Sequence, residues 1–201
     1  MVQKKTRPVR RKSSSGAGAI STEQGVAAAQ AVLEVAEAAG VDCALCGGIA
    51  VQLYGFTRAT RAVDFVAAEL LPLPRQRRLN FGGEAYAVKV GKRSIEVDWI
   101  VRDDDKQEAY QAALADAVVI EPEQLPILTP EWLVILKHLA GRGKDQLDLL
   151  WMLREDDLVD RKLVAKHVRK LMGRFAYWVL KDLEALYLEA DLLRARDEMG
   201  E

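Results

Sequence analysis

A short apolar stretch that ends at two consecutive glycines, with a helical pattern directly after it, constrains the fold of this chain most. Val41 to Cys46 has the composition of a buried strand, and Gly47-Gly48 ends it abruptly. Ile49 to Tyr54 then has a brief helical pattern, and Ala62 to Val66 is a second strand candidate. Glycines at a strand-to-helix turn let backbone N–H groups approach a phosphate closely, and the helix dipole favours the anion. A Gly-Gly pair equally suits a tight turn.

The other patterns divide the chain into a mixed N-terminal part and a helical C-terminal part. Ser21 and Gln24 fit a capping box, and Gly40 stands where the helix that they begin should end. Gly91-Lys92 separates two alternating segments and predicts a β-hairpin. The segments of the hairpin are Tyr86–Val90 and Ser94–Val101; the remaining predicted elements are a helix over Asp103–Ala115, a strand over Val118–Ile120, and helices over Pro130–Ala140, Lys144–Leu153, Asp160–Leu171 and Phe175 to about Arg196. This order predicts an α+β fold, with a small mixed β-sheet and its helices followed by a C-terminal helical bundle.

Three regions follow from the same patterns and from the charge distribution. Residues 1–20 are predicted to be a disordered basic arm, residues 21–120 the α+β domain, and residues 121–201 the helical domain. The net charge is −1, from 29 basic and 30 acidic residues, but the first twelve residues contain only basic charges. The arm is interpreted as a solvated tail or as a non-specific tether for nucleic acid.

Composition narrows the class of protein further. Cys43 and Cys46 are the only cysteines, and no second pair completes a zinc site. We interpret them as small apolar residues of a buried strand. No apolar run is long enough to cross a bilayer, and no apolar stretch follows the basic N-terminus as in a signal peptide. These features predict a cytoplasmic protein without membrane partners.

Several polar residues follow the two glycines in an ordered string. Arg58 and Thr60 precede the second strand, Asp64 lies on it, and Asp98 lies on a later strand. Side chains at positions i and i+2 of a strand face the same way, so carboxylates at that spacing can hold the same metal ions. Mg²⁺ prefers oxygen ligands and is commonly shared between carboxylates and substrate phosphates.

This string resembles the signature of nucleotidyltransferases of the DNA-polymerase-beta-like superfamily. That signature has a Gly-Gly turn, an Arg-x-Thr element, Asp-x-Asp on the next strand and a third Asp on a neighbouring strand. The resemblance implies that Gly47, Gly48, Arg58 and Thr60 bind a nucleoside triphosphate. It also implies that Asp64 and Asp98 are catalytic ligands of Mg²⁺ or Mn²⁺.

The chain departs from this signature at one position. Ala62 stands where the first Asp is expected. Loss of a metal-binding carboxylate removes transition-state stabilisation, and each 1.4 kcal/mol corresponds to about tenfold in rate. Glu96 lies two residues before Asp98 and is a candidate surrogate, or else a solvated edge charge. A natural inactive relative and a deliberately inactivated enzyme would both carry such a change.

A second motif lies in the helical part. Lys137, Arg142, Lys144, Asp145 and Asp148 follow one another in an order that resembles the Lys-x-x-Ala-x-Arg-x-Lys-Asp-x-x-Asp signature of the abortive-infection (AbiEii-type) toxin family. The resemblance implies that Lys137, Arg142, Lys144 and Asp145 lie near the nucleotide. From the residues alone, a structural role for Asp145 and Asp148, as a helix cap plus a salt bridge, is supported as well as a role at the nucleotide.

Two functions are therefore predicted. The first is toxin-like transfer of a nucleotide to RNA or protein, impaired by Ala62, with an antitoxin protein as a further partner. The second is a non-catalytic regulatory or partner-binding module that reuses the fold. Trp99, Trp132, Trp151 and Trp178 are expected in the core rather than at a base-stacking surface.

Overall fold

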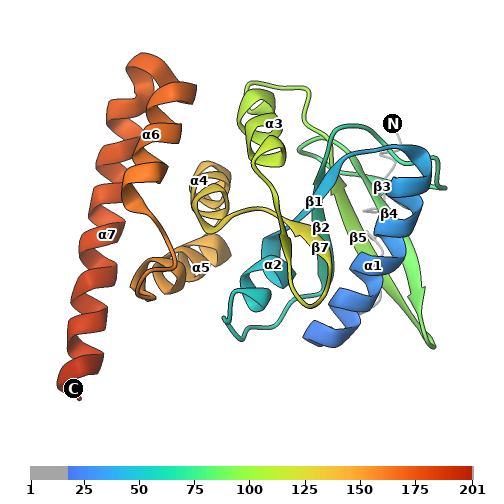
Figure 1. Cartoon of the computed structure of the whole chain (residues 1–201), viewed down its shortest axis with the longest axis horizontal. Helices are drawn as coiled ribbons and strands as arrows, with labels where there is room; N and C mark the ends of the chain where they lie inside the picture. The colour runs from blue at the N-terminus through green and yellow to red at the C-terminus, as the bar shows by residue number, and fades with distance from the viewer. Residues whose placement is uncertain (1–17, 201) are drawn as a thin grey trace, which may run out of the picture.

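The structure is a computed structural model that describes residues 18–200, without the side chain of Lys144. Most of the predicted basic arm, residues 1–17, lies outside the described residues. Figure 1 shows the sheet at one end of the molecule, α6 and α7 at the other, and α4 and α5 between them.

The first helix begins and ends as its sequence predicts. α1 spans Thr22–Ala39, and its N-cap Ser21 and Gln24 form the capping box. Gly40 ends the helix in the left-handed conformation, with a φ of +67°. Just before the helix, Ile20 is buried and its N–H donates to the carbonyl of Thr60 over 2.9 Å. The start of the described chain is thereby attached to the segment that precedes Asp64.

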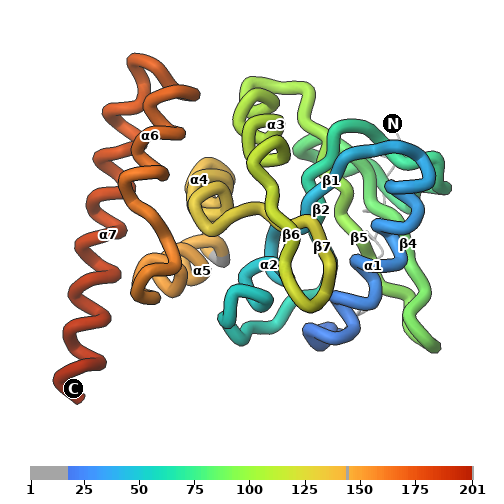
Figure 2. The backbone as a smooth tube through the Cα atoms, in the orientation of Figure 1, coloured from blue at the N-terminus to red at the C-terminus, as the bar shows by residue number. Residues whose placement is uncertain are grey.

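Within residues 18–200, seven strands form one mixed sheet. Its central strands are β1 (Cys43–Cys46), β2 (Ala62–Ala67) and β5 (Arg93–Ile100). β2 pairs antiparallel with β1 and parallel with β5. The other strands are β3 (Arg77–Arg78), β4 (Glu84–Val90), β6 (Val118–Ile120) and β7 (Leu125–Ile127), and the order across the sheet is β3-β4-β5-β2-β1-β7-β6. Figure 2 shows β6 and β7 beside β1 and β2.

Three details of the sheet bear on the predictions. The expected hairpin is confirmed, because β4 and β5 pair antiparallel around Gly91, whose φ is +58°. β3 and β7 had no predicted counterpart. β7 pairs with β1 through Leu45 and Ile127, so the sheet extends past residue 120.

The helical elements follow the predicted order. α2 spans Gly47–Leu53, and α3 spans Gln107–Ala115 between β5 and β6. α4 (Pro130–Ala140), α5 (Gly143–Arg154), α6 (Arg161–Met172) and α7 (Ala176–Met199) form the C-terminal part. The predicted α+β class, with a mixed sheet followed by a helical bundle, is confirmed. No helix of the described residues is long and apolar enough to cross a membrane.

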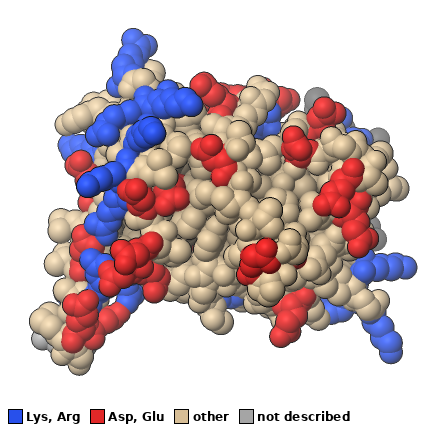
Figure 3. Space-filling view, in the orientation of Figure 1, with Lys and Arg blue, Asp and Glu red and all other residues tan. Residues whose placement is uncertain are grey.

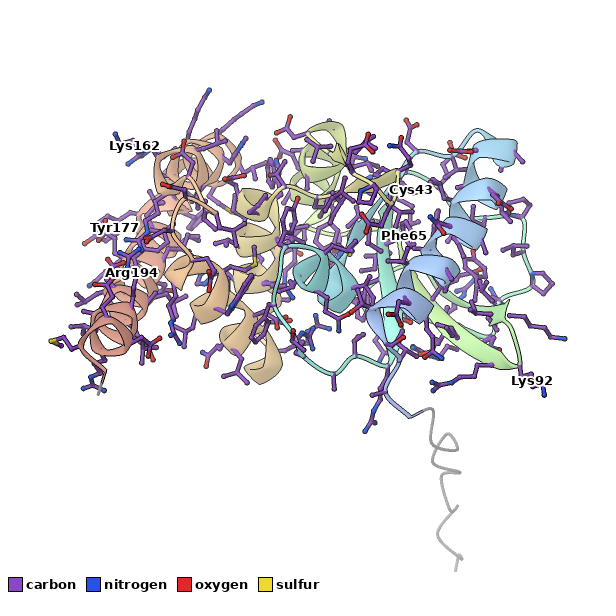
Figure 4. The ribbon with its side chains drawn as sticks, turned by 60° about the horizontal axis from the view of Figure 1, so that its bottom comes forward. Cys43, Phe65, Lys92, Lys162, Tyr177 and Arg194 are labelled. Atoms are coloured by element: carbon purple, nitrogen blue, oxygen red, sulfur yellow. The ribbon has the colours of Figure 1, made fainter. Side chains whose placement is uncertain are left out.

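The side chains expected in the core divide into two groups. Trp99 and Trp132 are fully buried, and Trp151 stacks on Phe56 with ring centroids 4.9 Å apart. The prediction for Trp178 is wrong, because its side chain is 63% exposed on α7. α7 packs on α5 and α6 through positions such as Leu183, and Trp178 lies on another face of the helix. Figure 4 shows its neighbour Tyr177 at the surface and Phe65 in the interior.

The two cysteines lie in β1, as expected of apolar strand residues. Both are buried free thiols. Burial raises the pKa of Cys43 to about 12 and raises that of Cys46 as well. Both groups are therefore neutral at physiological pH and are poor nucleophiles.

Candidate functional site

The site centres on the register between β2 and β5. Asp64 pairs with Asp98, and Ala62 pairs with Glu96. Residues that pair across neighbouring strands point to the same face of the sheet, and so do positions two apart on one strand. One face of the sheet therefore carries Asp64, Asp98 and Glu96, with Ala62 beside them. The two predicted ligand residues lie side by side, and the position of the missing carboxylate lies next to Glu96.

The two glycines make room for side chains of the protein itself. A Cβ atom on Gly47 would lie 2.1 Å from a carboxylate oxygen of Asp64, and the φ of Gly47 is +65°. A Cβ atom on Gly48 would lie 2.8 Å from both an Arg58 nitrogen and Thr60 Oγ1. Gly47 thus lets Asp64 lie against the turn, while Gly48 is buried beneath Arg58 and Thr60.

A substitution at Gly47 tests this close packing. We expect Gly47→Ala to lower the free energy of unfolding by roughly 2–4 kcal/mol, because a positive φ and a collision with Asp64 both oppose the new methyl group. Gly91→Ala is the matched control: its φ is also positive, at +58°, but no atom lies within 4 Å of the added Cβ. Urea denaturation measures both variants. Equal losses would mean that Asp64 moves aside without cost.

Arg58 and Thr60 are held by bonds within the protein. Thr60 Oγ1 donates to the carbonyl of Ala62 over 3.1 Å. Arg58 Nε lies 2.8 Å from Asp148 Oδ1. The Arg-x-Thr element therefore connects the strand that carries Asp64 to α5, on which Asp148 lies.

The second motif forms a buried network of charges. Lys137 Nζ lies 2.5 Å from Asp148 Oδ2 and 3.7 Å from Asp145 Oδ1. Arg142 Nε lies 2.6 Å from Asp145 Oδ2. Asp145 and Asp148 are almost inaccessible to solvent, and Lys137 is 6% exposed. Lys144 was also predicted to lie near the nucleotide, but its side chain lies outside the described part of the chain.

Both acids form the salt bridges that their structural interpretation predicts. Asp148 bridges Arg58, which precedes β2, and Lys137 from α4. Asp145 pairs with Arg142 at the start of α5. Both acids are salt-bridge partners, so they hold the side chains of Arg58, Lys137 and Arg142 in place. Of these three cations, Arg142 has the most accessible side chain, at 49%, against 19% for Arg58 and 6% for Lys137.

A cleft adjoins the carboxylate face. A cavity of about 270 Å³ is lined by Asp64, Arg102, Lys106, Tyr110 and Arg142, among others. A smaller cavity of about 40 Å³ continues from it, and Gly47, Asp64, Lys137 and Arg142 line its wall. A third cavity, of about 330 Å³, lies between Arg142 and α7 and is not lined by Asp64 or Asp98. We take the first two as the candidate site, because the carboxylate of Asp64 borders both.

Eight of the ten residues that line the larger cavity were not predicted as site residues from the sequence. They include Phe81, Arg102, Lys106 and Tyr110. Arg102 lies 5.2 Å from the ring of Tyr110, and Lys106 Nζ donates to the carbonyl of Leu139 over 2.7 Å. Burial raises the pKa of Tyr110 to about 12, so its phenol stays neutral. The position of Arg102, just after the strand that carries Asp98, was the one available signal.

Glu96 and Asp98 share a cationic partner. Arg77 on β3 reaches Glu96 Oε1 over 2.7 Å and Asp98 Oδ1 over 2.9 Å. The hydrogen bond to Glu96 raises the pKa of Arg77. Glu96 is thus more than a solvated edge charge.

The donor set fits one divalent cation better than two. Asp64 and Asp98 supply hard oxygen atoms side by side, which suits Mg²⁺ or Mn²⁺ shared with phosphate oxygens. Within residues 18–200, no group of three or more His, Cys, Asp or Glu side chains is arranged to hold a metal ion.

Comparison with solved structures finds six similar chains, among them the following two. One is the crystal structure of an antigenic nucleotidyltransferase-like protein from Paracoccidioides brasiliensis, with a TM-score of 0.50, 16% sequence identity, and coverage of 82% of this chain and 95% of that chain. The other is the solution structure of the antibiotic-resistance factor ANT(2'')-Ia, with a TM-score of 0.42, 13% identity, and coverage of 88% and 100%. No family model and no curated protein sequence matches this chain. The sheet order, the carboxylate pair on β2 and β5 and the first of these likenesses together give the conclusion that the chain has a nucleotidyltransferase-like fold.

Proposed function

We propose that this chain binds a nucleoside triphosphate together with Mg²⁺ or Mn²⁺ in the cleft beside Asp64, and that it transfers nucleotide only slowly. The observation that carries the proposal is Asp64, which is in register with Asp98 and borders a cleft that three basic side chains, Arg102, Lys106 and Arg142, also line. Ala62, on the same sheet face, is the reason for the slow transfer.

The charges of the cleft suit a triphosphate. Arg102, Lys106 and Arg142 line the larger cavity, and Lys137 lines the smaller one. A bound divalent cation would neutralise phosphate charge and orient the reacting oxygens, with Asp64 and Asp98 as its protein ligands. The side chains of the protein position the phosphates, which supplies much of the catalysis in phosphoryl transfer.

The acceptor in this proposal is RNA or a protein, as the resemblance to abortive-infection toxins suggests, and an antitoxin protein is the further partner. Exposed cations on α6 support an RNA acceptor. Figure 3 shows Lys and Arg side chains gathered at the end of the molecule where α6 lies. Lys162, Lys166, Arg169 and Lys170 are exposed there. Such a cluster attracts a polyanion without reading its sequence.

A non-catalytic module is the second candidate function. Ala62 and the ion pairs of Arg77 with Glu96 and Asp98 favour it, because both reduce the carboxylate charge available to a metal ion. The two functions differ in their response to a carboxylate at position 62: Ala62→Asp should speed transfer by an enzyme and should confer no transfer on a non-catalytic module.

Calorimetric titration with each of the four ribonucleoside triphosphates tests the binding proposal. With MnCl₂ present, we expect Asp64→Asn to weaken the preferred triphosphate by at least about tenfold, or 1.4 kcal/mol. With a chelator, the parent and the variant should bind with similar, weaker affinity. Asp42→Asn is the control, because Asp42 is an exposed acid before β1. No heat from any triphosphate with the parent protein would refute the proposal.

A further inference from the structure

The guanidinium of Arg77 places a positive charge at one end of the carboxylate row, which consists of Asp64, Asp98 and Glu96. Arg77, Ala85, Asp98 and Asp64 occupy the same level of four consecutive strands, β3, β4, β5 and β2. Their side chains therefore point to one face of the sheet. The side chain of Ala85 is only a methyl group. The guanidinium of Arg77 therefore passes across β4 to reach Asp98 on β5.

The contacts of Arg77 are specific. One nitrogen, Nη2, lies 2.7 Å from Glu96 Oε1 and 2.9 Å from Asp98 Oδ1, and Nε lies 3.4 Å from Glu96 Oε2. The guanidinium thus holds both oxygens of Glu96 and one oxygen of Asp98. These are the two carboxylates on β5 that neighbour the positions of Ala62 and Asp64.

We propose that Arg77 is a built-in cation that takes the place of a second divalent ion at Glu96 and Asp98, so that the chain keeps a single divalent position, beside Asp64, where Arg77 competes with the ion for Asp98. With alanine at position 62, this face carries one negative charge fewer. The single positive charge of Arg77 then balances part of the charge of Glu96 and Asp98 on β5. The inference rests on the proposed function in one respect: the triphosphate that binds together with the divalent ion is the ligand proposed there.

A divalent cation can displace the guanidinium of Arg77 from Asp98. β3 is a two-residue strand at the edge of the sheet, and the side chain of Arg77 is 47% exposed. Ion pairs of such exposure contribute little free energy, because water and salt screen them. Arg77 therefore competes with a divalent cation for Asp98 instead of excluding it permanently.

Manganese titration followed by electron paramagnetic resonance tests the inference on the full chain. The variants are Arg77→Gln and, as the matched control, Arg78→Gln, which removes the same charge from the next residue on the opposite face of β3. Each is titrated with Mn²⁺ alone and with Mn²⁺ plus inorganic triphosphate. We expect Arg77→Gln to bind Mn²⁺ about tenfold more tightly than the parent, and with triphosphate to bind a second ion, because a like charge next to the ligand oxygens is gone. Arg78→Gln should match the parent.

The outcomes separate the two proposals. Equal Mn²⁺ affinity in Arg77→Gln and Arg78→Gln, or weaker affinity in Arg77→Gln, overturns the inference. If no variant binds triphosphate while Arg77→Gln still binds Mn²⁺ more tightly, the nucleotide proposal fails and the role of Arg77 stands. Arg77→Lys, which keeps the charge and the fold contacts of the aliphatic stem, should retain the weak affinity of the parent. If Arg77→Gln does not fold, an affinity of Arg77→Lys equal to that of the parent supports the inference, and a tighter one opposes it.

Discussion

Replacement of Ala62 by aspartate is expected to raise the rate of nucleotide transfer by about a hundredfold or more, which corresponds to about 2.7 kcal/mol of transition-state stabilisation. The new carboxylate would lie two residues before Asp64 on β2 and in register with Glu96. It would share the sheet face with Asp64 and Asp98 and supply the third aspartate of the nucleotidyltransferase signature. A further anionic ligand near the attacking oxygen favours the transition state more than the bound ground state.

The measurement is single-turnover incorporation of labelled nucleotide into total RNA and into protein, with Mg²⁺ and with a chelator. Ala87→Asp is the matched control. Ala87 is exposed on β4 and pairs with Glu96 from the other side, so it points to the same sheet face but is separated from β2 by β5. Equal rates for the parent and Ala62→Asp would show that position 62 is not a ligand position. A protein that remains inactive in this assay would instead favour the non-catalytic module.

Removal of the Asp148 carboxylate is expected to give the largest loss of stability. Asp148 is fully buried, and it pairs with Lys137 over 2.5 Å and with Arg58 over 2.8 Å. Asp148→Ala leaves the buried ammonium of Lys137 without its nearest counter-ion, which costs about 3–5 kcal/mol. For a domain of this size that loss lowers Tm by roughly 6–20 °C.

Urea denaturation and thermal unfolding measure this loss. Asp156→Ala is the control, because Asp156 also pairs with an arginine, Arg194, but its side chain is 76% exposed. That change should cost less than about 1 kcal/mol. A loss for Asp148→Ala no greater than for Asp156→Ala would mean that Asp145, 3.7 Å from Lys137, is a sufficient counter-ion.

The elements of this fold were predictable where local chemistry specifies them. The capping box at Ser21, the left-handed cap at Gly40 and the hairpin at Gly91 each depend on a few neighbouring residues. The long helices α4 to α7 follow from repeated apolar spacing. β3 and β7 were missed because Arg77–Arg78 has no apolar residue and Leu125–Ile127 contains a proline, so that only pairing with neighbouring strands defines them.

The candidate site divides in the same way. The string from Gly47 to Asp64 indicated a nucleotidyltransferase-like site, and the gap at Ala62 was visible in the sequence. The roles of Asp64, Asp98 and the nucleotide-binding residues remain predictions. The exposure of Trp178 could not be inferred, since a helix with apolar residues on more than one side does not reveal which side packs.

By itself, the sequence determined which residues alternate along β2 and β5, where α1 begins and ends, and that alanine stands at position 62. These properties depend on bonds and contacts between residues close together in the chain. Only the tertiary structure decided that β5 lies parallel to β2 with Asp64 opposite Asp98, that Asp148 joins Arg58 to Lys137, and that Arg77 reaches Glu96 and Asp98 from the edge of the sheet. Those contacts join residues far apart in the chain, and they form because the packed sheet and helices bring opposite charges within reach of one another.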